Sequence, residues 1–330
     1  MASPVVVIAD PINEAGVEKL RQTCIVHDCG RTGESAAEVI IREAAEGVIV
    51  RALQVTAALM DAAPSLRIVA KHGAGVDNID IAAASERGVV VANTGGTNAP
   101  AVAEAAVALM LATLRHVPEV HGFVVNGEFD RRWSLLFDDL WERTVGLVGC
   151  GNIGRTVARI CRGGFGCTVL GYDPNMDAAA LEQSGIEKVE DLHDMLGRAD
   201  IVSVHTPLLP ATHHLIDRRA LEAMQRHAII VNTSRGEVID TAALAAALHE
   251  GVIAGAGIDV FEHEPMRADD PLLGAPNAVL SPHVAGATRA SRRRSAIGAA
   301  EAVLAVLADR KPDFVVNPEA WERRRRIATA

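Results

Sequence analysis

The chain has 330 residues, of which 49% are hydrophobic, and a formal net charge of −10. This length is sufficient for two domains of ordinary size, and the charge argues against a general nucleic-acid binder, which needs many basic side chains to neutralise phosphates. The hydrophobic runs are much shorter than the ~20 residues that cross a bilayer, and the N-terminal run lacks the basic flank of a signal peptide. We therefore expect a cytoplasmic protein with no nucleic-acid or membrane partner.

The predicted elements alternate between short β-branched strands and longer helical stretches rich in Ala and Leu. The candidate strands are Val5–Ala9, Ile25–Asp28, Val48–Arg51, Ile68–Lys71, Val89–Ala92, Val145–Val148, Thr168–Tyr172, Ile201–His205, Ile229–Asn232, Ala254–Asp259 and Val279–Pro282. Such alternation predicts an α/β protein whose parallel sheets carry helices on both faces. Eleven strands exceed one ordinary doubly wound sheet, so we expect two doubly wound domains.

Two long helical patterns suggest where the chain passes between these domains. One covers 101–117 after a Pro100 helix start, and the other covers 288–308 near the C-terminus. The few residues after Pro312 cannot form a domain, so we expect them to pack on the first one. The domain made of residues 99–286 would thus be inserted into a domain made of residues 1–98 and 287–330. The weakly periodic stretch 117–141 is interpreted as a linking arm or an oligomer contact.

The cysteines and the C-terminal basic run suggest no special chemistry. The five cysteines are odd in number and include no C-x-x-C pair, which favours reduced thiols: Cys24, Cys29, Cys150, Cys161 and Cys167. Cys150 lies inside a glycine motif and is interpreted as a small packing residue. The basic run from Arg323 to Arg326 is expected to be a solvated tail. We expect no metal.

A dinucleotide fingerprint follows the sixth candidate strand. Gly149, Gly151 and Gly154 form G-x-G-x-x-G between a strand and a helical pattern. The first glycine permits a tight turn, the second lets the backbone approach a pyrophosphate, and the third lets helix and strand pack closely. The helix N-terminus, with Asn152 and Ile153, would direct its free N–H groups to the phosphates.

Asp173 ends the next strand, 24 residues after Gly149. An acid near that spacing accepts hydrogen bonds from the adenosine ribose and repels a 2′-phosphate. No Arg follows it directly, so the predicted cofactor is NAD, which is favoured over NADP.

Three further strand ends carry reactive side chains in the same domain. They are Asn232-Thr233-Ser234-Arg235-Gly236, Asp259-Val260-Phe261-Glu262-His263-Glu264-Pro265 and Ser281-Pro282-His283-Val284-Ala285-Gly286. In an open α/β sheet, ligands bind beyond the carboxyl ends of the strands. Hydride transfer to a 2-keto acid builds negative charge on the carbonyl oxygen and needs a proton donor. A histidine, held by a carboxylate, can fill this role. An arginine can hold the substrate carboxylate in a bidentate fork.

Together these stretches resemble the D-isomer-specific 2-hydroxyacid dehydrogenases over nearly the whole chain. The resemblance is carried by K-H-G-A-G-V-D-N-I-D (71–80), V-G-C-G-N-I-G (148–154), H-T-P-L-L-P-A-T (205–212), N-T-S-R-G-E-V-I-D (232–240), D-V-F-E-H-E-P (259–265) and S-P-H-V-A-G-A-T (281–288). It implies a Rossmann NAD domain inserted into a flavodoxin-like substrate domain. It also implies that Arg235 binds and polarises substrate, that Glu264 pairs with the histidine, and that His283 is the acid/base.

The resemblance further implies contacts around the nicotinamide half of the cofactor. The residues in matching positions are Thr206, Pro207, Thr233 and Asp259, the last near the carboxamide. Ser234, Arg235, His283 and Ala285 are included as expected cofactor contacts. A homodimer through the long helix and arm is expected from family precedent.

On the substrate side, Gly73, Ala74 and Gly75 form a turn whose N–H groups are predicted to hold the substrate carboxylate. Arg51 and Lys71 end two strands of the same domain, and phosphoglycerate dehydrogenases resemble the chain at both positions. Our hypothesis is a second anionic group on C3 of the substrate, as in 3-phosphoglycerate or sulfolactate. Unlike some phosphoglycerate dehydrogenases, this protein is expected to lack an additional regulatory domain.

Two alternatives stay open at this point. One is a dinucleotide-sensing binding protein like the C-terminal-binding corepressors, which share the architecture and the triad. The other is formate or phosphite dehydrogenase chemistry within the same superfamily, in which the histidine would act differently.

Overall fold

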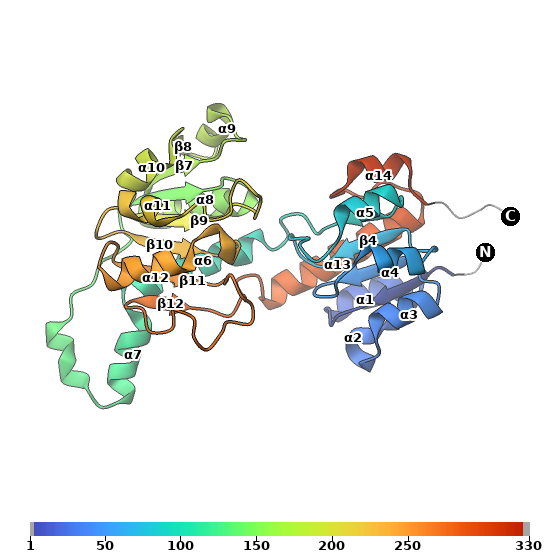
Figure 1. The fold of residues 1–330 in the computed structure, drawn as a ribbon, viewed down its shortest axis with the longest axis horizontal. Coiled ribbons are helices and arrows are strands. Elements are labelled where there is room, and N and C mark those ends of the chain that lie inside the picture. The colour runs from blue at the N-terminus through green and yellow to red at the C-terminus, as the bar shows by residue number, and fades with distance from the viewer. Residues whose placement is uncertain (1–2, 326–330) are drawn as a thin grey trace. The chain divides into compact units, whose positions relative to one another are not determined.

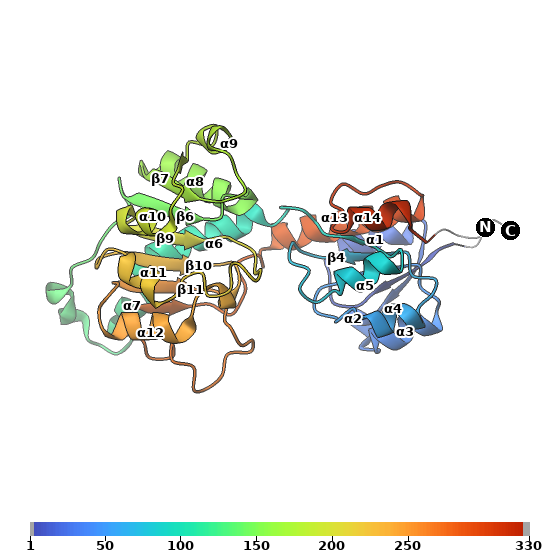
Figure 2. The same cartoon turned by 45° about the horizontal axis from the view of Figure 1, so that its top comes forward.

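The computed structural model describes residues 3–325. The chain forms two compact units, and we call them unit 1 (Met1–Asn98 and Ala287–Ala330) and unit 2 (Ala99–Gly286). Each unit contains one parallel sheet with helices on both faces (Figures 1 and 2). This is the predicted doubly wound architecture.

Unit 1 has five parallel strands in the order β2-β1-β3-β4-β5, which is the flavodoxin-like order. The strands are β1 (Val5–Ile8), β2 (Ile25–Asp28), β3 (Gly47–Val50), β4 (Ile68–Lys71) and β5 (Val90–Ala92). The helices are α1 (Glu14–Arg21), α2 (Cys29–Thr32), α3 (Ala36–Arg42), α4 (Ala57–Ala62), α5 (Ile81–Glu86), α13 (Arg289–Leu307) and α14 (Pro318–Glu322).

The period-two alternation of strand residues divides the core of unit 1 into two layers. Val6 and Ile8 pack with α1 and α13 residues such as Val17 and Val303, whereas Val7 packs with the layer formed by α3, α4 and α5. Both sheet faces are thereby buried, which is the usual state of a parallel sheet.

Unit 2 has seven parallel strands in the order β12-β11-β10-β9-β6-β7-β8, a Rossmann order with one added strand. The strands are β6 (Thr144–Val148), β7 (Thr168–Tyr172), β8 (Glu187–Lys188), β9 (Ile201–Val204), β10 (Ile229–Asn232), β11 (Gly255–Ile258) and β12 (Ala278–Leu280). The helices are α6 (Ala99–Leu114), α7 (Val117–Val125), η1 (Phe129–Ser134), α8 (Asn152–Phe165), α9 (Ala178–Glu182), α10 (Leu192–Arg198), α11 (Arg218–Ala223), η2 (Gly236–Val238) and α12 (Thr241–His249).

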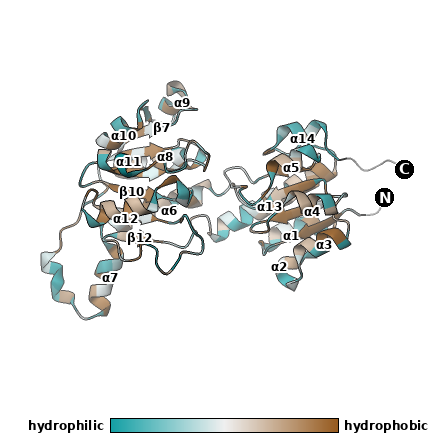
Figure 3. Cartoon of the chain, viewed as in Figure 1, coloured by the Kyte–Doolittle hydropathy of each residue, from teal (hydrophilic) through white to brown (hydrophobic). Residues whose placement is uncertain are grey.

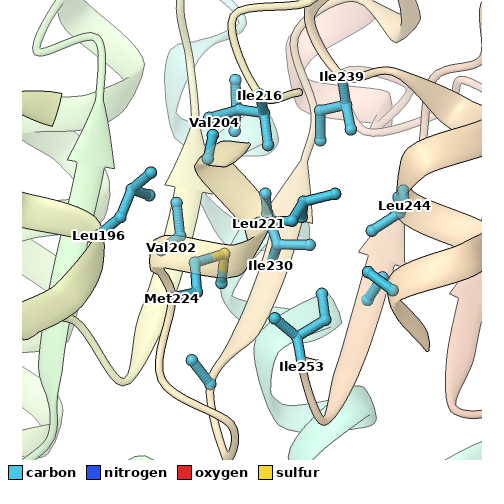
Figure 4. Close-up of a cluster of buried hydrophobic side chains, with 14 of the residues drawn as sticks. Leu196, Val202, Val204, Ile216, Leu221, Met224, Ile230, Ile239, Leu244 and Ile253 are labelled. Atoms are coloured by element: carbon cyan, nitrogen blue, oxygen red, sulfur yellow. The ribbon is translucent and has the colours of Figure 1, made fainter. Parts of the chain in front are cut away.

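The core of unit 2 also has two layers. Val202 and Ile230 point from the sheet toward the layer of α10, α11 and α12, where Leu221 and Leu244 meet them (Figure 4). The opposite face packs against α6 and α8. The hydropathy colouring shows the same pattern, because the strands are mainly hydrophobic and the polar residues lie on the helices and loops (Figure 3).

The strands lie within one or two residues of their predicted positions, with one omission. The sequence analysis missed β8, a two-residue edge strand made of the charged pair Glu187 and Lys188. Two charged residues cannot show an alternating hydrophobic pattern, so the sequence contains no signal for this strand. It is a strand because it forms backbone ladder pairs with β7.

The C-terminal segment packs on unit 1, as predicted. Asn317 accepts a hydrogen bond from the Val91 backbone N–H at 2.8 Å, and Val315 bridges to Ala92. The solvated-tail prediction was wrong for part of the basic run. The guanidinium of Arg325 donates to the carbonyls of Ala63, Pro64 and Leu66, in the loop that follows α4.

Arg324 is similarly engaged, since its side chain is only 7% exposed and pairs with Asp309 at 2.7 Å. Arg323 is exposed, and Arg326 lies outside the described residues. All five cysteines are buried and free. In the described chain, no single helix is long and apolar enough to span a membrane. Only α6 and α7 taken together, which are bent by 60° relative to each other, have a sufficient length and apolar composition.

Candidate active site

The glycine loop joins β6 to α8, and its conformation explains two of its glycines. Gly149 has a φ of 93°, and a Cβ there would lie 2.8 Å from the Thr206 backbone nitrogen. A Cβ on Gly154 would overlap the carbonyl oxygen of Gly149. The loop can therefore close tightly on the helix only with glycine at both positions.

Gly151 differs, because no heavy atom lies within 4 Å of the position that its Cβ would take. The open space lies beside the first turn of α8, which begins at Asn152 and Ile153. The first N–H groups of a helix lack intrahelical partners and attract anions. The loop thus has the shape and polarity that a dinucleotide pyrophosphate requires.

Asp173 follows β7 beside this loop. One carboxylate oxygen accepts from Cys150 N–H and the other from Asn175 N–H, both at 2.9 Å. These bonds orient the carboxylate and leave lone pairs for further donors such as ribose hydroxyls. Burial, together with the Asp173 charge, raises the pKa of the Cys150 thiol to about 12. Cys150 is therefore an inert packing residue.

His283 and Glu264, two residues of the predicted catalytic set, are in direct polar contact. His283 Nδ1 lies 2.7 Å from Glu264 Oε2, and the other oxygen of Glu264 accepts from Phe261 N–H at 3.1 Å. The carboxylate accepts a hydrogen bond from Nδ1–H, which favours the neutral tautomer with the hydrogen on Nδ1 and a free lone pair on Nε2. The His283 side chain is 50% exposed and is thus accessible to a ligand.

Asp259 holds the turn that carries His283. Its carbonyl oxygen accepts from His283 N–H at 2.7 Å, and its carboxylate accepts from Val284 and Ala285 N–H at 3.0 and 2.8 Å. His283 has a φ of 53°, a left-handed conformation that is unfavourable for a side chain with a Cβ. Three successive hydrogen bonds from one buried residue stabilise this conformation. The sequence analysis assigned Asp259 only to cofactor contact and missed this role.

Arg235 follows β10 at the same sheet edge. Asn232, the last strand residue, accepts from the N–H and hydroxyl of Ser234 and donates to the carbonyl of Arg235 at 2.8 Å. The Arg235 guanidinium donates to the Ser234 carbonyl at 2.6 Å. The N-T-S-R sequence therefore forms a rigid turn that orients Arg235.

The remaining predicted cofactor residues lie at neighbouring strand ends. Thr206 and Pro207 follow β9, and Thr233 follows β10. The buried hydroxyl of Thr233 has no hydrogen-bond partner among the described residues, and such a group needs an explanation such as a missing ligand. This hydroxyl and the open Gly151 fit NAD, which would be held by these residues.

A small pocket adjoins Asp259 within unit 2. It encloses about 230 Å³ and is lined by Ser281, Val284, Ala285 and three alanines of α6, namely Ala105, Ala108 and Ala112. The sequence analysis missed these alanines, whose small side chains leave the space open. Their spacing along one helix face was the available signal.

In unit 1, the Gly73–Gly75 turn follows β4. Gly73 has a φ of 138°, and its N–H donates to the Thr94 hydroxyl at 3.2 Å. Within residues 3–325, the N–H groups of Ala74 and Gly75 donate to no other group. The turn therefore presents two backbone donors, which fits an anion nest.

Arg51 directly follows β3, and Lys71 ends the neighbouring strand β4 of this sheet. The Arg51 backbone N–H donates to Asp10 at 2.7 Å, and its guanidinium donates to the Pro11 carbonyl at 3.1 Å. The Lys71 ammonium donates to the Arg51 carbonyl at 2.6 Å and contacts Asn78. Both cations thus donate to backbone carbonyls of their own unit.

Residues 107–285 match the protein-family model described as the NAD binding domain of D-isomer specific 2-hydroxyacid dehydrogenases. A glyoxylate reductase of Thermofilum pendens is 38% identical over 98% of this chain and 97% of its own length. A D-3-phosphoglycerate dehydrogenase of Methanocaldococcus jannaschii is 36% identical over 94% of this chain, which spans only 59% of that relative.

A solved structure gives the same result. The NADPH-dependent glyoxylate/hydroxypyruvate reductase of Sinorhizobium meliloti, in complex with NADP and malonate, superposes with a TM-score of 0.85 at 32% identity and covers 99% of this chain and 100% of its own. The chain therefore belongs to the D-isomer specific 2-hydroxyacid dehydrogenase family and is an NAD-dependent oxidoreductase of 2-hydroxy acids.

Proposed function

We propose that this enzyme interconverts a D-2-hydroxy acid and its 2-keto acid, with His283 as the acid/base. The observation that carries this proposal is the 2.7 Å contact between His283 Nδ1 and Glu264 Oε2. Because Nδ1 is engaged, Nε2 is the nitrogen that exchanges a proton with the substrate oxygen. Bound NAD supplies or accepts the hydride at C2.

Arg235 binds the substrate carboxylate and stabilises the charge that develops on the reacting oxygen. A guanidinium suits both tasks because it presents a planar fork of donors and stays charged at all working pH values. The Asn232–Ser234 hydrogen bonds support this role, because they fix the backbone from which the arginine extends.

Asp173 selects NAD over NADP. Its two backbone hydrogen bonds hold a negative charge where the second strand of the nucleotide-binding half ends. A 2′-phosphate placed near this carboxylate would be repelled, whereas ribose hydroxyls would donate to it.

Unit 1 binds the substrate through the Gly73–Gly75 turn, and the substrate carries a second anionic group that Arg51 recognises. The two unpartnered N–H groups of the turn support the first part, and the position of Arg51 at the end of β3 supports the second. Candidate substrates are the 3-phospho, 3-sulfo and 3-carboxylate derivatives of pyruvate. The S. meliloti reductase is described with malonate, a dicarboxylate.

The enzyme is a homodimer formed through α6 and the arm that contains α7 and η1. The arm exposes Trp133 by 79%, Leu136 by 95% and Trp141 by 59%. Apolar exposure of this extent within one segment is typical of an interaction surface. Analytical ultracentrifugation checks this: a monomer at micromolar concentration contradicts it.

A panel of substrates tests the proposed function. The purified protein is mixed with NADH and, in separate reactions, glyoxylate, hydroxypyruvate, 3-phosphohydroxypyruvate, 3-sulfopyruvate and oxaloacetate. We expect NADH oxidation with at least one keto acid and faster turnover with NADH than with NADPH. Formate and phosphite are tested with NAD in the reverse assay. Turnover with these two alone, or binding of NADH without any turnover, contradicts the proposal.

A further inference from the structure

A cavity in unit 2 lies on α8, apart from the proposed catalytic residues. It encloses about 500 Å³ and is lined by Arg155, Arg159, Arg162, Gly163, Gln183 and Ser184. We call it the arginine groove. The three arginines are separated by four and three residues, so they form one stripe along the helix, about 10 Å long.

The turn after α9 lies opposite the arginines and leaves room for one of them. Gly185 in this turn has a φ of 67°, and a Cβ at this position would overlap the guanidinium of Arg162. Gln183 and Ser184 of the same turn contribute an amide and a hydroxyl. Gly163 leaves its side of the groove open, since nothing lies within 4 Å of its Cβ position.

The positive charge of the groove is uncompensated within the described chain. No carboxylate in residues 3–325 lies within ion-pair distance of the three arginines, whereas Arg198 and Arg218 of the same unit are paired with acidic side chains. In a chain of net charge −10, three adjacent unpaired guanidinium groups are a local concentration of positive charge that attracts anions.

We propose that the arginine groove binds a condensed phosphate chain, such as tripolyphosphate or the phosphate chain of a nucleotide. Guanidinium groups match phosphate oxygens in a bidentate manner, and a stripe of three suits a ligand with several charges in a row. The lining contains no apolar or aromatic side chain, so nothing in it would hold a base or an acyl group. For the same reason, and because of the net charge, single-stranded RNA is a poor fit.

The groove is separate from the glycine loop over most of its length. In a parallel sheet, a crossover helix runs back from the carboxyl edge of the strands, so the C-terminal part of α8 is remote from the pyrophosphate position. Only Arg155 is near it, since its backbone N–H donates to the Gly151 carbonyl and its side chain donates to Asn152 at 3.1 Å. Phosphate binding would therefore leave the NAD site available.

Isothermal titration calorimetry of the full chain with tripolyphosphate tests the proposal. We expect saturable binding of tripolyphosphate whose affinity falls as the salt concentration rises. The double variant Arg159→Gln with Arg162→Gln should lower this affinity about 10- to 100-fold. The matched control is Arg219→Gln with Arg226→Gln, which removes the same charge from exposed arginines of unit 2 that have no ion pair among the described residues. The control pair should bind tripolyphosphate like the wild type, and keto-acid reduction should be unchanged in the groove pair.

Competing titrations identify the occupant. ATP that binds as tightly as tripolyphosphate, or more tightly, supports the phosphate chain and indicates whether a nucleoside adds affinity. Loss of binding in the presence of saturating NAD would place the phosphate at the glycine loop and overturn the proposal. Absence of wild-type binding, equal weakening in both variant pairs, or tighter binding of an RNA oligonucleotide would also overturn it.

Discussion

Both units contain a parallel sheet whose carboxyl edge carries the proposed functional groups, yet the two edges differ in kind. The edge of unit 2 carries ionisable side chains, with His283 bonded to Glu264 and with Arg235 after β10. The edge of unit 1 presents mainly backbone, in the Gly73–Gly75 turn, with Arg51 as the candidate cation. We therefore propose that unit 2 determines the reaction and that unit 1 determines which acid is accepted.

The largest expected effect tests the unit 2 half of this comparison. His283→Asn removes the proton donor but keeps a polar side chain at the left-handed position, which asparagine tolerates better than most residues. We expect kcat to fall about 10²- to 10⁴-fold with every substrate, while NADH binding measured by fluorescence changes little. A fall confined to one substrate would show that His283 selects the acid rather than transferring the proton.

A partly buried histidine beside the glycine loop is expected to contribute to the acid sensitivity of unit 2. Burial lowers the pKa of His205 to about 4 from 6.5, and its Nε2 is bonded to the Ser203 hydroxyl at 2.9 Å. The unfolded chain takes up a proton near pH 6.5 and the folded chain does not, so this contribution is complete above pH 6.5 and is lost as pH falls toward 4. It amounts to about 3 kcal/mol.

Thermal unfolding between pH 7.5 and 4.5 measures this dependence. His205→Asn should show a flatter loss of Tm on acidification than the wild type. Burial also lowers the pKa of His72 in unit 1, so some acid sensitivity should persist in that variant. An unchanged pH profile would show that folding does not lower the pKa of His205.

The unit 1 half of the comparison predicts a selective effect. Arg51→Ala should raise KM for a 3-phospho or 3-sulfo substrate about 10- to 30-fold, because one charge-assisted hydrogen bond is lost. KM for glyoxylate, which has no C3 group, should stay within a factor of about two. Equal changes for both substrates would remove the second anionic group from the proposal and leave the Gly73–Gly75 turn as the substrate contact.

The smallest expected effect concerns the cofactor. Asp173→Ala should reduce the ratio of kcat/KM for NADH to that for NADPH about 5- to 10-fold, since the ribose acceptor and the repulsive charge are both removed. Asp173→Asn retains hydrogen bonding and should give an intermediate ratio. An unchanged ratio would mean that other residues distinguish the two cofactors.

Much of the fold was predictable because the short hydrophobic runs of the sequence are also the strands of the two sheets. Val6, Val7 and Ile8 alternate between two buried layers, and the glycine loop needs glycine for steric reasons at Gly149 and Gly154. Local patterns of this kind are visible in one sequence.

The features that escaped prediction depend on contacts between distant parts of the chain. The ordered Arg325 meets carbonyls more than 250 residues away, and only the tertiary structure brings them together. Asp259 was assigned to the cofactor, although its carboxylate accepts from Val284 and Ala285 and its carbonyl from His283. Strand β8 exists through its pairing with β7 rather than through its own residues.

The configuration of the product tests the central claim most directly. The enzyme is incubated with NADH and the most active keto acid of the panel, and the 2-hydroxy acid is resolved by chiral chromatography. We expect the D-isomer in amounts equal to the NADH consumed, and its formation about 10²- to 10⁴-fold more slowly in His283→Asn. An L-isomer, a racemic product, or NADH consumption at the wild-type rate in that variant would contradict the proposed reaction.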